Sequence, residues 1–523
     1  MAANSSPPDI IAALDLGTNS FHLVITGIRN GQLEILDTAK EEVRLGDGLD
    51  ISGYLTPESQ DRAIRHLIEI RRIIDSRGCQ VRAVATHAIR SAKNHEELLV
   101  RIETETGIHV ELIDGYEEAR LSWLGMRSAI DLNNSITLGV DIGGGSTELI
   151  IARNNDFHFI SSLKTGTVTL RNRFFAMEDP LPDEIDRARG HILMTLSPLT
   201  REATRHTFRR AVACSGTAKA LARIIHRQRK HGDLDDPNGF RFTREELAAL
   251  EQRLIEVASP ARIRRLFKVD KRRSEIILTG CMILRAIGDL LNVDEWTVSG
   301  SGLREGIAID TFIRRGQLTS GNFVNIRGRS IRAFGDRHGL DRSFAENLQQ
   351  AALLIYDALE PYFPMPDQAA NRELLSHAAW LMECGMSVAY KGYHKHTSYM
   401  ILNGVIPGFS EEEKALIAYI CRHSRKKPAS QKGKNKSALR KVAPHLRRIN
   451  FLASCLRIAR ALNRSRAARV VSAEFDEENH VLFLQAKYDS PRGPEADQQS
   501  LLKERKHLAK ALGIPLEPRL QMV

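Results

Sequence analysis

Cysteine is scarce in this sequence, and long hydrophobic runs are absent. The 523 residues include six cysteines at scattered positions, with no CxxC pair. This spacing excludes a disulfide framework and a zinc ribbon, and it predicts reduced thiols. No apolar run approaches the ~20 residues of a membrane span, and the first residues, MAANSSPPD, lack the basic and apolar regions of a signal peptide. The sequence therefore predicts a cytoplasmic protein with no membrane partner.

Acidic residues are missing from one basic segment. Residues 421–469 contain 16 Lys and Arg and not one Asp or Glu, and removing this charge from the net +11 leaves −5 for the rest of the chain. Such a segment attracts polyanions, which include polyphosphate, nucleic acid and an acidic membrane surface. The alternative is a solvated basic face, in which residues 426–436 (KKPASQKGKNK) form a flexible loop.

The order of the predicted strands and helices indicates a duplicated α/β fold. A chain of 523 residues is too long for one core and suggests three or four domains. Strand hairpins followed by alternating helices and strands are predicted over 9–123 and again over 135–315. The pattern then becomes helical, and short strands with a charged helix return after about 470. The expected domains, with a cleft between the first two, are 1–123, 124–315, 316–469 and 470–523.

Two glycine-rich turns carry the main functional signal. DLGTNSFHLVI at 15–25 and DIGGGSTELII at 141–151 each follow a short apolar run and lead into another β-prone run. Gly, Ser, Thr and Asn in a tight turn offer N–H groups and hydroxyls to phosphate oxygens. The Asp at the start of each turn can hold a hydrated Mg²⁺. A single turn of this kind is commonly an ordinary β-hairpin, but two matching copies favour a phosphate site.

The turns are two of six motifs that resemble one protein family in order and spacing. The six are DLGTNSFHLVI, THAIRSA at 86–92, GYEEARL at 115–121, DIGGGSTEL at 141–149, SGT at 215–217 and GLREG at 302–306. They are similar to the exopolyphosphatase and guanosine pentaphosphate phosphohydrolase family, in the superfamily of actin, sugar kinases and heat-shock chaperones. The resemblance covers nearly the whole chain. It implies two ribonuclease H-like (actin-like ATPase) domains, an all-α HD-like domain and a small α/β C-terminal domain.

The resemblance also implies roles for individual residues. Glu118, the second Glu of the EEA triplet, matches the catalytic carboxylate that orients or deprotonates the attacking water. Its neighbour Glu117 also suits a helix N-terminus without any catalytic role. Asp141 and Glu148 resemble the magnesium-side carboxylates, and Asp15 would assist through water. The implied substrate-binding residues are Gly17, Thr18, Asn19, Ser20, Arg90, Gly143, Gly144, Gly145, Ser146, Thr147, Ser215, Gly216 and Thr217.

Some of these assignments have plainer alternatives. The SGT at 215–217 opens a predicted helix, whose N-terminus suits an anion, but Ser and Thr are also ordinary helix caps. Arg44 is a weaker phosphate-binding candidate than Arg90. The family usually has Ser-Gly before the glutamate pair, and Asp114 departs from that pattern while both glutamates remain.

The helical region departs from the HD phosphohydrolases that it resembles. Their metal site needs an adjacent His-Asp pair, but Met382 and Glu383 stand at that place, and Arg460 takes the place of the closing Asp. His394 and His396 remain, and two histidines do not make a closed divalent site. We expect a scaffold and dimer-forming module with a basic channel and no HD-type metal chemistry.

The leading hypothesis is a Mg²⁺-dependent exopolyphosphatase that releases orthophosphate processively from the end of linear polyphosphate. The alternatives are a guanosine pentaphosphate 5′-phosphohydrolase, a kinase or ATPase of the superfamily, and a non-catalytic polyanion-binding protein. A water-directed Glu118 disfavours the kinase. The intact set of Asp141, Glu148, Glu118 and Arg90 disfavours the binding protein. The resemblance implies a homodimer, and nucleic acid is not an expected partner.

Overall fold

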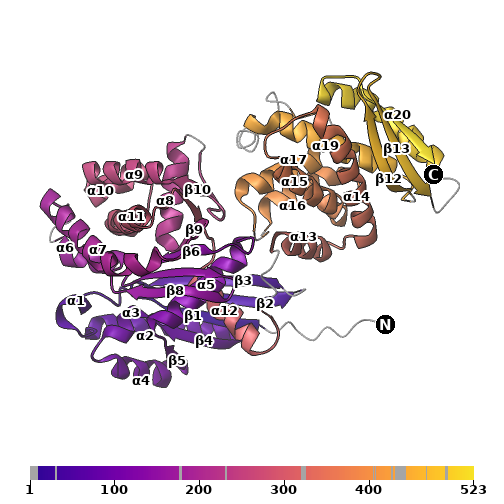
Figure 1. The fold of residues 1–523 in the computed structure, drawn as a ribbon. Helices are drawn as coiled ribbons and strands as arrows, with labels where there is room; N and C mark the ends of the chain where they lie inside the picture. Colours follow the sequence, from indigo (N-terminus) through magenta and orange to yellow (C-terminus); the bar gives the residue numbers. More distant parts are fainter. Residues whose placement is uncertain are drawn as a thin grey trace. The chain divides into compact units, whose positions relative to one another are not determined.

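The chain forms two compact units, residues 1–326 and residues 327–523 (Figure 1). The computed structural model describes residues 10–522 except 30–31, 176–178, 230–231, 320–325, 405, 407, 426–427, 430–442, 467 and 489–492. Most of the predicted loop at 426–436 therefore lies outside the described residues.

The first unit begins with a five-stranded sheet in the order β3-β2-β1-β4-β5. β1 pairs antiparallel with β2 and parallel with β4. Alternate residues of β1 face opposite sides, so that Leu14 and Leu16 enter one core while Ala13 and Asp15 point to the other face. The strands are β1 (Ile10–Leu16), β2 (Ser20–Arg29), β3 (Gln32–Glu42), β4 (Gln80–Ala85) and β5 (Val110–Leu112).

A second sheet repeats this topology. Its order is β10-β11-β9-β6-β7-β8, and without β10 it matches the first sheet strand for strand, with β6 in the place of β1. β6 likewise pairs antiparallel with the next strand and parallel with β9. The predicted duplicated α/β fold is confirmed. The strands are β6 (Thr137–Ile142), β7 (Thr147–Arg153), β8 (Asp156–Leu163), β9 (Arg210–Cys214), β10 (Arg241–Thr243) and β11 (Glu295–Val298).

Helices cover both sheets. On α2 an apolar stripe at helical spacing, with Ile64, Leu67, Ile70 and Ile74 buried, packs into the core of the first sheet. The hydroxyl of Thr56 accepts the Ser59 N–H and caps this helix. The helices of this unit are α1 (Leu49–Ser52), α2 (Pro57–Ser76), α3 (His87–Ser91), α4 (His95–Thr106), α5 (Gly115–Ala129), α6 (Thr167–Phe174), α7 (Pro182–Ala203), α8 (Ser215–Gln228), α9 (Arg244–Val257), α10 (Pro260–Phe267), α11 (Lys271–Leu290) and α12 (Leu303–Arg314).

Two helices lie between the sheets and pack on each other. α5 contacts β6, β7 and β8, and α12 contacts β1, β2 and β4. Glycines permit the close approach: a Cβ on Gly306 would lie 1.8 Å from the carbonyl oxygen of Leu121, and one on Gly125 would lie 2.0 Å from that of Gly302. The helix that carries Glu118 is thereby fixed against both halves of the unit.

Replacing Gly306 with alanine should therefore destabilise the first unit by about 3 kcal/mol, because the new methyl group meets backbone that cannot move aside. The midpoint of thermal unfolding measures this loss. Gly190→Ala on α7 is the matched control, since nothing lies within 4 Å of its Cβ position. That variant should unfold no earlier than the unaltered protein, because alanine favours a helix interior. Equal midpoints for both variants would show that the α5–α12 contact is not tight.

The second unit is a helical domain that ends in a three-stranded sheet of order β12-β13-β14. The predicted change from helices to short strands after about 470 agrees with this arrangement. Its elements are α13 (Ile326–Arg337), α14 (Arg342–Leu359), α15 (Gln368–Leu381), α16 (Tyr393–Asn403), α17 (Glu411–His423), α19 (Leu446–Leu462), β12 (Ala468–Asp476), β13 (Val481–Tyr488), α20 (Gly493–Leu512) and β14 (Glu517–Met522).

Ion pairs occupy the positions at which the HD resemblance would place metal ligands. The guanidinium of Arg460 contacts Glu504 at 2.9 Å, and Glu383 receives Arg466 at 2.6 Å. A cation at position 460 repels a metal ion, and Arg466 already neutralises the carboxylate of Glu383. These contacts favour the expectation that HD-type metal chemistry is missing.

Candidate active site

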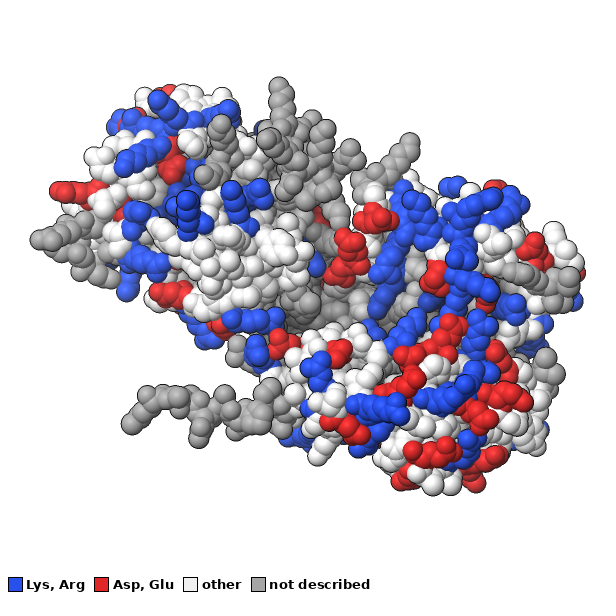
Figure 2. Space-filling view, turned by 180° about the vertical axis from the view of Figure 1, so that it is seen from behind, with Lys and Arg blue, Asp and Glu red and all other residues white. Residues whose placement is uncertain are grey.

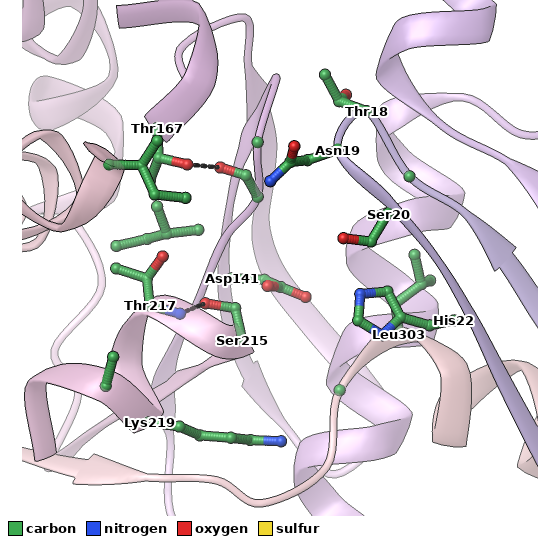
Figure 3. A pocket seen from close by; sticks show the side chains of 18 of the residues that line it. Thr18, Asn19, Ser20, His22, Asp141, Thr167, Ser215, Thr217, Lys219 and Leu303 are labelled. Atoms are coloured by element: carbon green, nitrogen blue, oxygen red, sulfur yellow. Dashed lines mark hydrogen bonds between the residues drawn. The ribbon is translucent and has the colours of Figure 1, made fainter. Parts of the chain in front are cut away.

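A polar cavity of about 510 Å³ lies in the first unit and is lined from both of its sheets. The turn between β1 and β2 and the turn between β6 and β7 form two of its walls. The N-terminal ends of α8 and α12 contribute further lining, including Ser215, Thr217 and Leu303 (Figure 3). The N-terminal end of α11 also lines the cavity. On the face that Figure 2 shows, Lys and Arg are interleaved with Asp and Glu over much of the outer surface. The cavity is lined by a group of carboxylates, called its floor below, and by cations from several elements, called its walls.

The two glycine turns have the same backbone hydrogen bond. The N–H of Gly17 donates to the Ser20 carbonyl at 3.2 Å, and the N–H of Gly143 donates to the Ser146 carbonyl at 2.9 Å. A Cβ on Gly17 would lie 2.9 Å from that carbonyl oxygen, and one on Gly143 would lie 3.1 Å away. The close approach therefore favours glycine at the first turn position in both halves, and most strongly at Gly17.

The turns also contact each other. A Cβ on Gly145 would lie 2.2 Å from the ring of His87 and 2.7 Å from the hydroxyl of Thr18. Gly144 faces Thr18 and Asn19 at ordinary contact distances. The glycines of the second turn thus make room for residues of the first half, and both turns border the same cavity.

Four carboxylates form the floor: Asp15, Glu118, Asp141 and Glu148. Asp141 and Glu148 are directly opposed on β6 and β7 and so share a face of the sheet. The hydroxyl of Ser122 donates to Asp141 at 2.6 Å, and the hydroxyl of Ser162 donates to Glu148 at 2.8 Å. These serines fix the two carboxylates in position.

The floor residues fit a hard divalent cation. Burial raises the pKa of Asp15, Asp141 and Glu148, and neighbouring carboxylates raise the pKa of each further. Oδ1 of Asp15 is buried and has no hydrogen-bond partner among the described residues. Oxygen donors that repel one another and include an unpaired atom are a suitable environment for Mg²⁺, which binds through few carboxylates and keeps several waters.

The pH dependence of folding should reveal these carboxylates. A raised pKa means that each group holds its proton in the folded state over pH values at which the unfolded chain has lost it, so stability falls as pH rises through that window. Mg²⁺ would replace the protons. The rise in unfolding temperature caused by Mg²⁺ should therefore be larger at about pH 8 than at about pH 5.5. An equal rise at both pH values, measured by differential scanning calorimetry, would contradict this reading of the floor.

Glu118 lies at the edge of this group, on the first turn of α5. The side chain of Asp114 accepts the Glu117 N–H and caps the helix, so the departure from the family's Ser-Gly pattern leaves a normal N-cap. Nη1 of Arg90 donates to Glu118 at 3.0 Å and to the carbonyl of Ile113 at 2.7 Å. Burial nevertheless raises the pKa of Glu118 to about 7, which suits a group that accepts a proton near neutral pH.

The cavity brings together most of the residues that the sequence predicted for the site. Glu118, Asp141 and Glu148 line it, together with Gly17, Thr18, Asn19, Ser20, Gly143, Gly144, Gly145, Ser146, Ser215, Gly216 and Thr217. Arg90 does not line the cavity and instead pairs with Glu118. Thr147 is buried, and its hydroxyl donates to the Thr165 carbonyl. Arg44 pairs with Glu42 and does not line the cavity either.

Sequence reasoning missed His22, which stands in the first half where Glu148 stands in the second. Asp15 pairs with His22 across β1 and β2, as Asp141 pairs with Glu148 across β6 and β7. Each partner follows its Asp by seven positions, so an alignment of the two turns would have found it. Burial lowers the pKa of His22 to about 3, so its imidazole is neutral at neutral pH.

Sequence reasoning also missed the cations of the walls. The lining includes Lys40, Lys219, Arg223, Arg227, Lys268, Arg272, Arg273 and Arg304. Three of them, at positions 219, 223 and 227, repeat every four residues along α8, and that spacing was a visible signal. The others come from distant parts of the chain: Arg272, for example, hydrogen-bonds the Asn19 carbonyl at 3.0 Å across the cavity.

Comparison with known proteins identifies the relatives of this chain. The model of the Ppx/GppA phosphatase family matches residues 24–314, and that of Ppx/GppA phosphatase domain III matches residues 326–498. An exopolyphosphatase structure from Cytophaga hutchinsonii is 28% identical with a TM-score of 0.55, covering 60% of this chain and 99% of its own. The Aquifex aeolicus PPX-GPPA enzyme is 30% identical with a TM-score of 0.50, covering 58% of this chain and 100% of its own.

No described helix is both long and apolar enough for a membrane span. All six cysteines lie in the described part of the chain, and they are free. The matched family models span most of the sequence, and the cavity holds the glycine turns and carboxylates that phosphoanhydride chemistry requires. The chain therefore belongs to the Ppx/GppA phosphatase family and is a phosphoanhydride hydrolase.

Proposed function

We propose that the protein is an exopolyphosphatase, which hydrolyses the terminal phosphoanhydride bond of linear polyphosphate. The observation that supports this substrate is the row of Lys219, Arg223 and Arg227 along one face of α8. Residues four apart on a helix are separated by about 6 Å along its axis, so the row extends for about 12 Å. A polymer with a charge on every unit can contact each of these cations, whereas a single terminal phosphate can contact only one.

The partners of this row leave much of its positive charge available. Lys219 donates to the Gly300 carbonyl at 2.5 Å, and Arg223 donates to the carbonyls of Leu234 and Asp235. A carbonyl orients a cation without cancelling its charge. Among the ion pairs of the described residues, Arg227 is the one member of the row that takes part, with the exposed Asp233 at 3.0 Å. Burial raises the pKa of Asp141, and the charge of Lys219 opposes this shift, so the row begins near the carboxylate floor.

The chain's own groups account for the steps of hydrolysis. The turn N–H groups and the helix N-terminus at Ser215 hold the terminal phosphoryl oxygens. Glu118 accepts a proton from the attacking water or orients it, while Arg90 fixes the direction of that carboxylate. When Mg²⁺ is bound by Asp141 and Glu148, with Asp15 near it, the cation supplies charge neutralisation for the phosphoryl oxygens.

Removing two arginines of the row should discriminate between long and short substrates. The double variant Arg223→Ala/Arg227→Ala should raise KM for long-chain polyphosphate about 10-fold or more, because two charge-assisted contacts are lost. Its KM for triphosphate should change far less, since that substrate ends near the floor. Arg264→Ala/Arg265→Ala on α10 is the matched control, because it removes equal charge from exposed residues that do not line the cavity. Equal effects on both substrates would contradict the proposed route of the polymer.

A guanosine pentaphosphate 5′-phosphohydrolase would use the same floor and turns. Its substrate also ends in a phosphoanhydride, and its phosphates would reach the first cations of the row. The described contacts identify no group that selects a guanine base, and so we rank this substrate second.

A further inference from the structure

A second group of metal-ligating side chains lies outside the cavity, where the end of β3 meets α2. Its members are Glu41, His66 and Glu69. Nδ1 of His66 is 3.2 Å from Oε2 of Glu41 and 3.7 Å from Oε2 of Glu69. One donor atom from each residue lies within 4.8 Å of both others. Three donors from two elements therefore converge on one point.

The spacing of these donors suits a small transition-metal ion. Zinc binds His nitrogen and carboxylate oxygen at about 2.0–2.2 Å in tetrahedral geometry, which sets neighbouring donors about 3.4 Å apart. The two measured separations from His66 bracket this value. His66 and Glu69 are three residues apart on α2 and so lie on one face of the helix. The imidazole favours Zn²⁺, Co²⁺ or Ni²⁺ over Mg²⁺, which prefers oxygen alone.

The electrostatics also favour a cation between these groups. Nδ1 of His66 is buried and makes no hydrogen bond within the described chain. Both glutamates lie within 4 Å of Nδ1 of His66, and neither has an ion pair with a lysine or arginine among the described pairs. A proton on Nδ1 could interact closely with Glu41 alone, because the 3.7 Å contact with Glu69 is too long for a hydrogen bond. A divalent ion could bind both carboxylates at once.

The group lies directly behind the cavity wall. Successive residues of a strand point to opposite faces, so Glu41 points away from the side on which Lys40 lines the cavity. Glu42 also reaches the cavity side, where it pairs with Arg272 at 3.3 Å. A metal ion that joins Glu41 to α2 would fix the strand segment that presents these two residues.

We propose that Glu41, His66 and Glu69 form a binding site for a zinc-like divalent ion, with water in the fourth position. The site is separate from the carboxylate floor, and its role is to fasten the end of β3 to α2. Its existence does not depend on the proposed substrate.

Metal binding to the full-length, metal-free protein tests this proposal. Zn²⁺ is titrated by equilibrium dialysis in excess Mg²⁺, which occupies the floor, and Co²⁺ replaces it for visible absorption spectroscopy. The unaltered protein should bind one more Zn²⁺ per chain than His66→Ala does. The Co²⁺-loaded unaltered protein should show the absorption bands of tetrahedral Co²⁺, and His66→Ala should lack them. Glu69→Gln should weaken binding at least 10-fold, and its exposed position makes misfolding of this variant unimportant.

His109→Ala is the matched control, because His109 is paired with the single carboxylate of Glu103 at 3.5 Å. That variant should bind zinc as the unaltered protein does. Equal zinc content in the unaltered protein and His66→Ala, or equal affinity in Glu69→Gln, would overturn the proposal. A contact between His66 and Glu41 without a metal ion would then be the correct description.

Discussion

Glu118→Gln should lower kcat for orthophosphate release by about 10²–10⁴-fold while the protein remains folded. Glutamine keeps the shape of the side chain and can still contact Arg90, but it cannot accept a proton from water. The carboxylate borders the cavity, and burial raises its pKa to about 7. KM should change little, since the role proposed for Glu118 is toward the attacking water rather than toward the bound phosphates. Steady-state phosphate release at saturating Mg²⁺ measures both constants.

Glu117→Gln provides the matched control for this prediction. Glu117 precedes Glu118 in sequence but does not line the cavity, and it pairs with Arg120 at 2.7 Å. Arg120 in turn contacts Asp310 at 2.8 Å, so this glutamate belongs to an ion-pair network between α5 and α12. Its variant should retain kcat within a few-fold. A large loss in Glu117→Gln with little loss in Glu118→Gln would reverse the assigned roles.

Asp141→Asn should raise the Mg²⁺ concentration needed for half-maximal activity by at least about 100-fold. Loss of a residue that only supports a metal ligand already lowers metal affinity by up to about 100-fold. The reason is that Asp141 is opposed to Glu148 and held by Ser122, so its carboxylate is a firmly positioned oxygen donor of the floor. Activity is measured over a Mg²⁺ titration. The loss should appear as a higher Mg²⁺ requirement before it appears as a lower maximal rate.

The variant Asp156→Asn removes an equivalent charge from an exposed position on β8 and should leave the Mg²⁺ titration unchanged. If Asp141→Asn followed the same titration curve as the unaltered protein, the metal would have to be held elsewhere. Asp15, with its unpaired buried oxygen, would then be the next residue to replace.

Much of the fold could be predicted because its signals are local. The hairpin at Asp15 and the hairpin at Asp141 are short-range patterns of strand, glycine and strand, and both stand as predicted. Ser215 begins a helix directly after a strand, also as predicted, but its φ of 85° is a left-handed conformation that sequence did not indicate for a serine. The role of each carboxylate is implied by the family resemblance and not by any local pattern.

The cation walls could not be predicted in full because they depend on long-range packing. Lys40, Arg272 and Arg304 come from three separate elements, and no local pattern marks any of them as facing a shared cavity. The contact of Arg90 with Glu118 is of the same kind, since 28 positions separate the two residues. A strand-end arginine was expected to bind phosphate directly. In the structure its guanidinium contacts the carboxylate.

The most direct test of the account is orthophosphate release by the purified protein with Mg²⁺, with long-chain polyphosphate, guanosine pentaphosphate and ATP offered separately. The row on α8 predicts the highest kcat/KM for polyphosphate, a lower value for guanosine pentaphosphate and the lowest for ATP. Faster release from guanosine pentaphosphate than from polyphosphate would contradict the proposed substrate. No release from any of the three, with salt-sensitive polyphosphate binding retained, would contradict the catalytic role of Glu118 as well.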